Sequence, residues 1–416
     1  MEHIVFVEST TSGAGFQAVK YAKECGLNVT LLTRNGNKYR GNEEGDITGL
    51  IDEEVNIETN DTDQVCQTVL MLHSRMAVTA VTTFSDYYVP QAACAASMLN
   101  LPSITYAASL RARNKYLTRL HLRATAPELN PNFIFGPVSD MEELNSAHLT
   151  FPLVLKPIDE NDSHLVKLVY TADEAMAHAE TIKQNDLNRN GKKRLGGILA
   201  EEFIGGDEFS VEVYKGGPSE PMVPLGITKK CFSGIDRGYF IEIGHIFPTH
   251  EHEDMLNSTA EKTINALGID RAVCHLEMKV FKNQVKVLEV NPRLAGVLIG
   301  SWLIEAATGA SAVKLALDCA RGLKPEWRPT RKKLVAAYFL ESSKSGRLVT
   351  DIQIPDNRPQ NIIHCGRYSH IGDFIQPPQR GGHLLAYAIA EGDSTEDALN
   401  AARDFVSKFR YEVDNY

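Results

Sequence analysis

The segment HLEMKVFKNQVKVLEVNPR, residues 275–293, holds two apolar runs around a Lys-Asn-Gln turn, and each run carries one glutamate, Glu277 and Glu289. This pattern predicts a β-hairpin. Because side chains alternate faces along a strand, Glu289 and Asn291 share one face. A three-residue loop over 282–284 would place Glu277 directly opposite Glu289, whereas a two-residue loop would place it on the diagonal. In both registers the two carboxylates occupy one small patch.

Two carboxylates on one patch of a hairpin need a compensating charge. Like charges placed opposite each other destabilise a strand pair, and a divalent cation removes that conflict. Mg²⁺ takes hard oxygen ligands, commonly one or two carboxylates together with water and phosphate oxygens. Glu277, Glu289 and Asn291 are therefore the predicted metal ligands. The alternative is a solvated face that the lysines of the hairpin neutralise. Arg293 favours the metal, because a guanidinium beside a metal–phosphate site can bind a carboxylate or an acyl phosphate.

The elements that must position these residues follow from the hydrophobic pattern. Residues 1–108 open with a strand–helix–strand unit and predict a small doubly wound α/β domain. The remainder of the chain is predicted to be of α+β type, with a basic, Asn-rich loop at 185–194. A change to a basic, Pro-containing composition at 324–333 suggests the start of a C-terminal subdomain. The predicted strands are 4–7, 29–33, 77–84, 103–106, 151–157, 164–170, 198–204 and 208–214; the predicted helices are 16–26, 90–99, 111–123, 171–184, two across 294–320, and 394–409.

Composition narrows the class of protein. The chain has 416 residues, 43% of them hydrophobic, which allows two to four domains with a large core. Its net charge of -10 argues against a nucleic-acid binder with a general basic surface. The 7 cysteines are scattered singly, which predicts a reduced chain without a structural zinc site. We find no signal peptide and no apolar stretch long enough to span a membrane, and so expect a cytoplasmic protein.

Taken in order along the chain, these pieces resemble the ATP-grasp superfamily, within it the carboxylate–amine ligases, and most of all the L-amino-acid ligases (dipeptide synthases). They are also similar to biotin carboxylase. The joint order and spacing of the motifs carries the resemblance, which implies an α/β and α+β multidomain ATP-grasp fold. The implied parts are a doubly wound pre-ATP-grasp domain (1–108), a linker helix (109–126), a mobile lid (127–200), a catalytic core (201–328) and a C-terminal subdomain (329–416).

The resemblance also assigns nucleotide-binding residues. Lys115 in ARNKYLTR matches the linker lysine that holds ATP phosphates, and Lys156 in FPLVLKP matches the catalytic lysine of the lid. Glu201 in LAEEFI matches the residue whose carboxylate accepts from the adenine amino group. Glu208 matches the acid that binds the ribose hydroxyls. The remaining implied contacts are the backbone of Glu202, Phe203 and Ile204 at the adenine edge, and Ser163 at the phosphates.

The reaction centre is implied in the same way. Glu277, Glu289 and Asn291 match the metal ligands, and Arg293 matches the catalytic arginine beside the reacting phosphoryl group. The segment GYFIEIGHIFP, 238–248, resembles a strand that faces the acceptor site. The substrate candidates are Glu242 for an amino group, His245 for a carboxylate, Arg293, and Trp302 as a pocket wall, although a strand-surface acid, a core histidine and a core tryptophan remain the alternatives for Glu242, His245 and Trp302.

One departure concerns the lid loop. The family pattern has a glycine-rich loop after the lid lysine, but IDENDSHLVKLV, 158–169, contains no glycine. Ser163 alone keeps the family's loop chemistry, and Asp159, Glu160 and Asp162 add negative charge. Either Ser163 and a few backbone amides suffice to hold the phosphates, or the acids face a cationic substrate.

The resemblance implies an ATP-dependent ligase that joins a carboxylate and an amine, both amino-acid-like, through an acyl phosphate, with release of ADP and phosphate. Its implied cofactors are ATP and Mg²⁺, with Mn²⁺ as a substitute. Its partners would be small-molecule carboxylates and amines, as in natural-product biosynthesis, and the chain is expected to form a homodimer. Two alternatives stay open: biotin carboxylase-like carboxylation from bicarbonate, and a non-catalytic nucleotide-binding protein.

Overall fold

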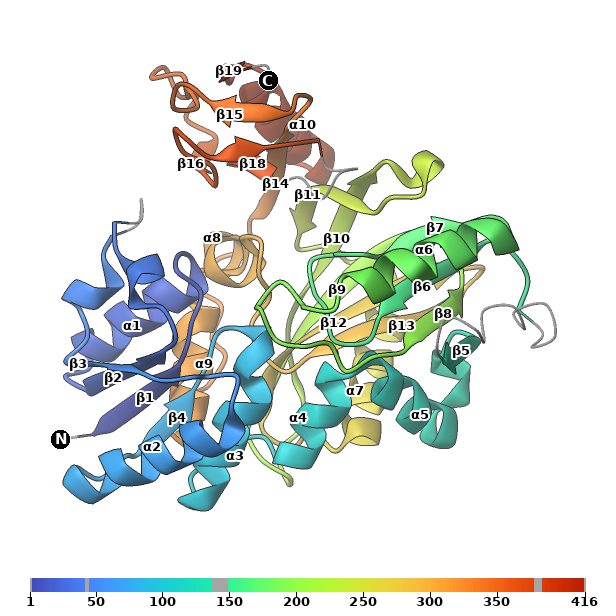
Figure 1. Cartoon of the computed structure of the whole chain (residues 1–416). Helices are drawn as coiled ribbons and strands as arrows, with labels where there is room; N and C mark the ends of the chain where they lie inside the picture. The colour runs from blue at the N-terminus through green and yellow to red at the C-terminus, as the bar shows by residue number, and fades with distance from the viewer. Residues whose placement is uncertain (1, 42–44, 137–148, 378–383, 415–416) are drawn as a thin grey trace.

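A computed structural model describes residues 2–41, 45–136, 149–377 and 384–414. Its N-terminal part is a parallel sheet of order β3-β2-β1-β4 (Figure 1). Helix α1 packs on one face together with the later α9, whereas α2 and α3 pack on the other. The bounds are β1 His3–Val7, α1 Ala14–Glu24, β2 Asn28–Thr33, β3 Glu53–Asn56, α2 Thr62–Arg75, β4 Ala80–Thr82 and α3 Val89–Met98.

The connection from this domain is helical. The expected strand at 103–106 is wrong: Thr105 caps a helix by accepting from the Ala108 amide at 3.2 Å, and α4 runs over Tyr106–Arg113. The expected single helix at 111–123 is two helices. Asn114 leaves the helical conformation, and its Oδ1 caps α5 (Lys115–Thr125). This break places Lys115 at the first position of α5.

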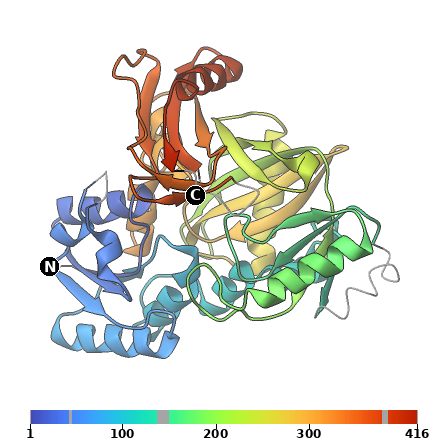
Figure 2. The ribbon, with the colours of Figure 1, turned by 45° about the horizontal axis from the view of Figure 1, so that its top comes forward.

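The lid is a four-stranded sheet of order β5-β8-β6-β7, and α6 covers one face of it (Figure 2). Alternate residues of β6 and β8 pack against the apolar side of α6, because successive side chains of a strand point to opposite faces. The bounds are β5 Phe133–Gly136, β6 Leu153–Pro157, β7 Lys167–Val169, α6 Ala172–Gln184 and β8 Ile198–Glu202.

The centre of the molecule is an eight-stranded sheet of order β13-β12-β9-β10-β11-β14-β18-β16. Helix α7 packs on β9 and β13, and its other neighbours are α4 and α5. The first strands are β9 Asp207–Lys215, β10 Val223–Ser233, β11 Ile241–Phe247, β12 Ala272–Phe281 and β13 Gln284–Asn291, and α7 is Glu253–Leu267.

The same sheet continues into the C-terminal part of the chain. Strand β11 pairs with β14, for example Gly244 with Tyr338, so hydrogen bonds cross the boundary expected at 328/329, which itself stays a prediction. The bounds are α8 Ile304–Thr308, α9 Ala312–Ala320, β14 Leu334–Glu341, β15 Gly346–Leu348, β16 Ile362–Arg367, β17 Phe374–Ile375, β18 Leu384–Gly392, α10 Thr395–Val406 and β19 Val413–Asp414. Helix α10 covers β14 and β18, and β17, β15 and β19 form a small separate sheet.

Among the described residues, no helix combines the length and the apolar character that crossing a bilayer would require.

Candidate active site

A large cavity lies between the lid sheet and the central sheet and encloses about 1140 Å³ of empty space, including its open mouth. The residues predicted from the sequence come to it from five segments: α5, the lid loop with β6, β8–β9, β11, and the β12–β13 hairpin with the residues that follow it. All of them line it except His245 and Trp302. The predicted residues in the lining are Lys115, Lys156, Ser163, Glu201, Glu202, Phe203, Ile204, Glu208, Glu242, Glu277, Glu289, Asn291 and Arg293.

The hairpin has a two-residue loop and still places its glutamates opposite each other. Phe281 pairs with Gln284, and the loop residues Lys282 and Asn283 have positive φ angles of 48° and 61°, typical of a tight hairpin turn. The register then shifts by one residue at Leu288, so that Glu277 pairs with Glu289. A β-bulge therefore reconciles the two registers that the sequence left open. The bulge also turns the Leu288 carbonyl toward Arg119, whose Nη2 donates to it at 2.8 Å.

Both hairpin glutamates are paired with lysines. Glu277 Oε1 lies 2.5 Å from Nζ of Lys230, and Glu289 Oε2 lies 3.0 Å from Nζ of Lys115. Lys230 also contacts Glu242 at 2.8 Å and Glu208 at 3.7 Å, with its own side chain only 2% exposed. The carboxylates of Glu277 and Glu289 therefore face lysine ammonium groups from other segments, and the hairpin face that carries them is not simply exposed to solvent.

Sequence reasoning missed Lys230, although a signal was present. Lys229 and Lys230 are neighbours on a strand, and successive strand residues point to opposite faces. One of the two lysines therefore had to point inward. Lys229 pairs with Glu251 and Asp207, which are exposed, whereas Lys230 is buried among carboxylates.

The charges of this cluster are unevenly shared. Burial raises the pKa of Glu208 to about 7, and the nearby Glu277 reinforces this rise while Lys230 opposes it. Burial opposes ionisation of Glu242 too, but Lys230 and His245 together hold its pKa at about 2. Burial likewise lowers the pKa of Lys230, yet the surrounding carboxylates raise it well above its usual value. The cluster is therefore ionised at neutral pH except for Glu208, which lies near its midpoint.

The Glu201 side chain has a different surrounding from the one implied. Its two oxygens are taken by Arg119 and by Lys156, the latter at 2.6 Å, and all three side chains are almost fully buried. Burial lowers the pKa of Lys156, and Glu201 counteracts that effect. An adenine amino group would share the Glu201 carboxylate with these two cations, and the adenine contact of Glu201 stays a prediction. In this structure the carboxylate of Glu201 orients Lys156.

The end of the cavity near Phe203 has an aromatic wall, formed with Phe240, that the sequence did not reveal. Lys279 Nζ lies 5.3 Å from the ring centroid of Phe203 and 5.9 Å from that of Phe240. The amides of Glu202 and Phe203 already donate to the Asn132 and Pro152 carbonyls, at 2.9 and 3.3 Å. The residues expected at the adenine edge were Glu202, Phe203 and Ile204. The two bonds above engage the amides of Glu202 and Phe203 and do not involve the amide of Ile204.

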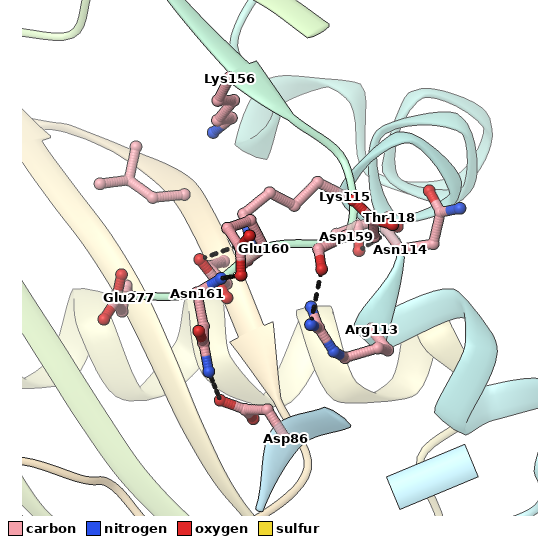
Figure 3. Close-up of polar contacts among 12 residues, drawn as sticks. Asp86, Arg113, Asn114, Lys115, Thr118, Lys156, Asp159, Glu160, Asn161 and Glu277 are labelled. Carbon is pink, nitrogen blue, oxygen red and sulfur yellow. Dashed lines mark hydrogen bonds and ion pairs between the residues drawn. The ribbon is translucent and has the colours of Figure 1, made fainter. Parts of the chain in front are cut away.

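Arg293 is held by the N-terminal domain. Its Nε donates to Asp86 Oδ1 at 2.5 Å, its Nη2 donates to Oδ2 of the same carboxylate, and its Nη1 donates to the Leu294 carbonyl. Asp86 is 3% exposed and lies just beyond the end of β4. Asn161 of the lid loop also points at Asp86 (Figure 3), with its Nδ2 3.5 Å from Oδ2. Three separate parts of the chain therefore meet at Arg293.

The glycine-free lid loop adopts backbone angles that glycine usually supplies. Asp162, Ser163 and Leu165 have positive φ angles of 52°, 51° and 58°. For residues with side chains such angles carry strain, which surrounding contacts must offset. Ser163 lines the cavity, as the sequence predicted.

The acids of this loop face arginines of the chain itself. Glu160 lies 2.8 Å from Arg194 and also accepts from the Tyr87 hydroxyl, and Asp159 lies 3.6 Å from Arg194. Residues of α4 and α5 hold the backbone of the same loop. Lys115 Nζ donates to the Glu160 carbonyl at 2.6 Å, and Arg113 donates to the Asp159 carbonyl (Figure 3). For Asp159 and Glu160 this is evidence against the alternative in which the acids await a cationic substrate.

The loop at 185–194 extends these contacts to the N-terminal domain. Asn190 donates to Asn60 at 3.0 Å and accepts from the Tyr88 hydroxyl at 2.9 Å, and Arg34 donates to its carbonyl. Together with Glu160 and Arg194, this loop ties the lid to the domain that supplies Asp86. We call these contacts the lid tether.

Two predicted substrate residues lie outside the lining. His245 is fully buried; its Nε2 lies 2.8 Å from Glu242 and its Nδ1 3.2 Å from the Val297 carbonyl, so it acts on the cavity through Glu242. Trp302 stacks on His364, with ring centroids 3.8 Å apart, and packs against the main hydrophobic core. The core alternative for Trp302 therefore agrees with its position.

Comparisons with known proteins agree with this arrangement. Residues 149–301 match the model of the ATP-grasp domain, and residues 19–103 match that of the ATP-grasp N-terminal domain. The chain belongs to the ATP-grasp superfamily. The ATP-grasp domain match contains β6, β7, α6 and β8 of the lid and the complete hairpin, and the N-terminal match contains Asp86.

Individual ATP-grasp relatives are distant in sequence. The alanine–anticapsin ligase of Bacillus amyloliquefaciens is 24% identical over 256 residues; the match covers 56% of this chain and 52% of that protein, so the chain spans about half the length of the relative. The L-amino acid ligase structure from Bacillus licheniformis superimposes with a TM-score of 0.82 at 22% identity, over 100% of this chain and 99% of that one. The biotin carboxylase domain of the Hydrogenobacter thermophilus 2-oxoglutarate carboxylase, solved with MgADP, gives 0.72 at 14% identity, over 99% and 91% of the two chains.

Proposed function

We propose that this protein is an ATP-dependent carboxylate–amine ligase that forms an amide or peptide bond between amino-acid-like substrates. The observation that carries the proposal is the convergence of Lys115, Lys156 and Arg293 with Glu277 and Glu289 on one cavity. Compact cations suit a polyphosphate and an activated carboxyl group, and paired carboxylates suit a divalent cation. The names of the Bacillus relatives, both of them ligases, support this choice.

The donor set fits a nucleotide with its metal. Glu277, Glu289 and Asn291 would hold Mg²⁺ or Mn²⁺, which would neutralise phosphate charge. The ion pairs of the two glutamates support this metal assignment, because each glutamate already has an ammonium group within 3.0 Å. The metal would replace Lys115 at Glu289 and Lys230 at Glu277. Both lysines line the same cavity and can then bind phosphate oxygens.

The rest of the cavity supplies the nucleotide contacts. Phe203 and Phe240 line the cavity with ring centroids 6.3 Å apart, and a purine ring would pack against this aromatic wall beside Lys279. Glu208 would accept from the ribose hydroxyls, and Ser163 would donate to the phosphates at the lid.

The chemistry then follows from positions. A substrate carboxylate attacks the terminal phosphoryl group of ATP and forms an acyl phosphate, with ADP as the leaving group. Arg293, held by Asp86, binds the acyl phosphate. The amine in its neutral form, oriented by a hydrogen bond to the ionised Glu242, attacks the acyl carbon. The C–O bond to phosphate breaks as the amide forms, and the departing phosphate takes up the proton that the amine loses. The lid excludes water, because an acyl phosphate would otherwise hydrolyse.

A substrate-dependence assay tests the proposal. With ATP, Mg²⁺ and pooled amino acids, the purified protein should release phosphate only when a carboxylate substrate is present, and mass spectrometry should find the amide product. Bicarbonate-dependent release without amino acids would indicate biotin carboxylase-like chemistry. Nucleotide binding without any release would indicate a non-catalytic nucleotide-binding protein.

A substitution tests the metal ligands. Glu289→Gln should abolish phosphate release and keep the fold, since a neutral amide cannot balance the metal charge. Glu261→Gln, on the exposed side of α7, is the matched control and should leave activity unchanged. Full activity of the Glu289→Gln variant would contradict the metal assignment. We also infer a homodimer from the resemblance, which light scattering on the purified protein tests.

A further inference from the structure

A second cavity lies on the other side of Arg293 from the nucleotide cavity. It is bounded by the end of β4, by α3, by the start of β12 and by α9, and encloses about 610 Å³ including its mouth. Cavities of this size hold small molecules. Its position outside the carboxyl end of a parallel strand is one where α/β sheets commonly bind ligands.

The lining of this second cavity differs in charge from that of the nucleotide cavity. Its walls are mostly apolar, and Thr82, Thr83 and Ser103 add hydroxyl groups. Within the described parts of the chain, the lining contains two arginines, Arg271 and Arg293, and no carboxylate. The apolar wall is formed by Val81, Phe84, Val89, Ala92, Ala93, Pro102, Ile104, Ala272, Val273, Pro292, Leu294, Ala316, Cys319 and Ala320.

The two guanidinium groups are in different states. Arg293 already donates to both oxygens of Asp86 and to the Leu294 carbonyl. Arg271 has a buried Nη1 that makes no hydrogen bond to any described residue. A buried donor without a partner costs free energy, and a donor on a charged group costs more than a neutral one. Arg271 lines the cavity, and a carboxylate bound there would give its guanidinium group an anionic partner.

We propose that this cavity is a second small-molecule site, which binds a compound with an apolar body and one carboxylate. The body packs against the wall formed by α3 and α9, and the carboxylate pairs with Arg271. The site goes beyond the proposed ligase function, because it does not use the nucleotide cavity. Arg293 forms part of both walls, so the occupant contacts the side chain that would bind the acyl phosphate.

Direct binding of a probe tests this site without any need for catalysis. Hexanoate, followed by ligand-observed NMR and calorimetry, should bind the full-length protein both without nucleotide and with saturating ADP. Hexylamine, which has the same apolar body and the opposite charge, should not bind. Hexanoate that saturating ADP displaces would lie in the nucleotide cavity and would overturn the proposal.

Two substitutions locate the bound probe. Arg271→Gln removes the charge and should weaken hexanoate binding about tenfold, or roughly 1.4 kcal/mol. Ala316→Leu, at a partly exposed position of α9, fills the cavity and should weaken hexanoate binding by a similar factor. The melting temperature of this variant should stay near that of the parent protein. Arg403→Gln on the exposed face of α10 is the control and should bind normally. Unchanged binding in both cavity variants would refute the assignment, even if the ligase assay succeeded.

Discussion

Asp86 and Arg293, 207 positions apart in the chain, form a two-pronged ion pair in which Nε and Nη2 of the guanidinium donate to the two carboxylate oxygens. The N-terminal domain thereby orients a side chain of the ATP-grasp domain. A planar guanidinium held on one edge presents its remaining donors in a defined direction. The ion pair explains physically why a domain that contributes little to the nucleotide cavity would still matter for the reaction.

Removing the charge of Asp86 should therefore impair turnover more than nucleotide binding. We expect Asp86→Asn to lower kcat about 10- to 100-fold, the usual cost of losing a partner that orients a reacting group. The affinity for ADP, measured by calorimetry, should stay nearly unchanged. Asp63→Asn, an exposed change on α2 of the same domain, is the control. An equal loss of kcat in both variants would remove the orienting role from Asp86.

The lid tether should control how tightly the lid closes on ATP. Arg194 is buried against Glu160 and Asp159, so Arg194→Gln leaves two acids without their cation. We expect the KM for ATP to rise about tenfold, or ~1.4 kcal/mol, and hydrogen exchange over 158–169 to quicken.

Arg189 gives a matched control for this prediction. It pairs with Asp162 at 3.4 Å, and both side chains are more exposed than the Arg194 pair. Exposed ion pairs contribute little, so Arg189→Gln should change KM by less than about threefold. If the two arginine variants behaved alike, the buried pairing of Arg194 would not be what holds the lid.

The inward lysine of β10 should be essential for stability, and its outward neighbour should not. Lys230→Met leaves three carboxylates without their shared cation, and breaking such a buried arrangement costs about 3–5 kcal/mol. Lys229→Met removes only exposed pairs and should cost less than about 1 kcal/mol. Urea denaturation of both variants measures the difference. Added Mg²⁺ should restore part of the stability of Lys230→Met, since Glu277, one of these three acids, is also a proposed metal ligand. Equal costs for the two lysines would mean that the cluster does not depend on its central ammonium.

Glu208 should make the stability of the protein fall with pH. Burial raises its pKa from 4.5 to about 7 in the folded state, so between these values the native protein keeps a proton that the unfolded chain has released. The contribution of this carboxyl to the free energy of unfolding therefore decreases as pH rises through that window and stays low above it. Glu208→Gln should flatten the decrease between about pH 5 and about pH 8 in urea titrations. A variant with the parent's slope would show that other groups cause it.

Local sequence was enough to find the hairpin and its candidate metal ligands, whereas the resemblance to the ATP-grasp superfamily supplied the other predicted residues of the lining. Glu277, Glu289 and Asn291 lie on one short pair of strands, where alternation and turn pairing fix which side chains share a face. The exact register of the hairpin could not be read from its sequence, because both loop lengths were compatible with the pattern and the bulge at Leu288 has a partner, Arg119, on a helix distant along the chain.

The partners of the lining residues were decided by tertiary packing. The pairing of Arg293 with Asp86, the two cations on Glu201 and the acids around Lys230 all join segments whose separation along the chain carries no periodic signal. Residue type and the spacing of residues along a strand determine which kinds of partner a side chain can bind. Only the packing of the lid, the N-terminal domain and the central sheet against one another selects which of those partners it meets, because burial makes an unpaired charge too costly and so forces each charged group onto whatever opposite charge the fold brings near.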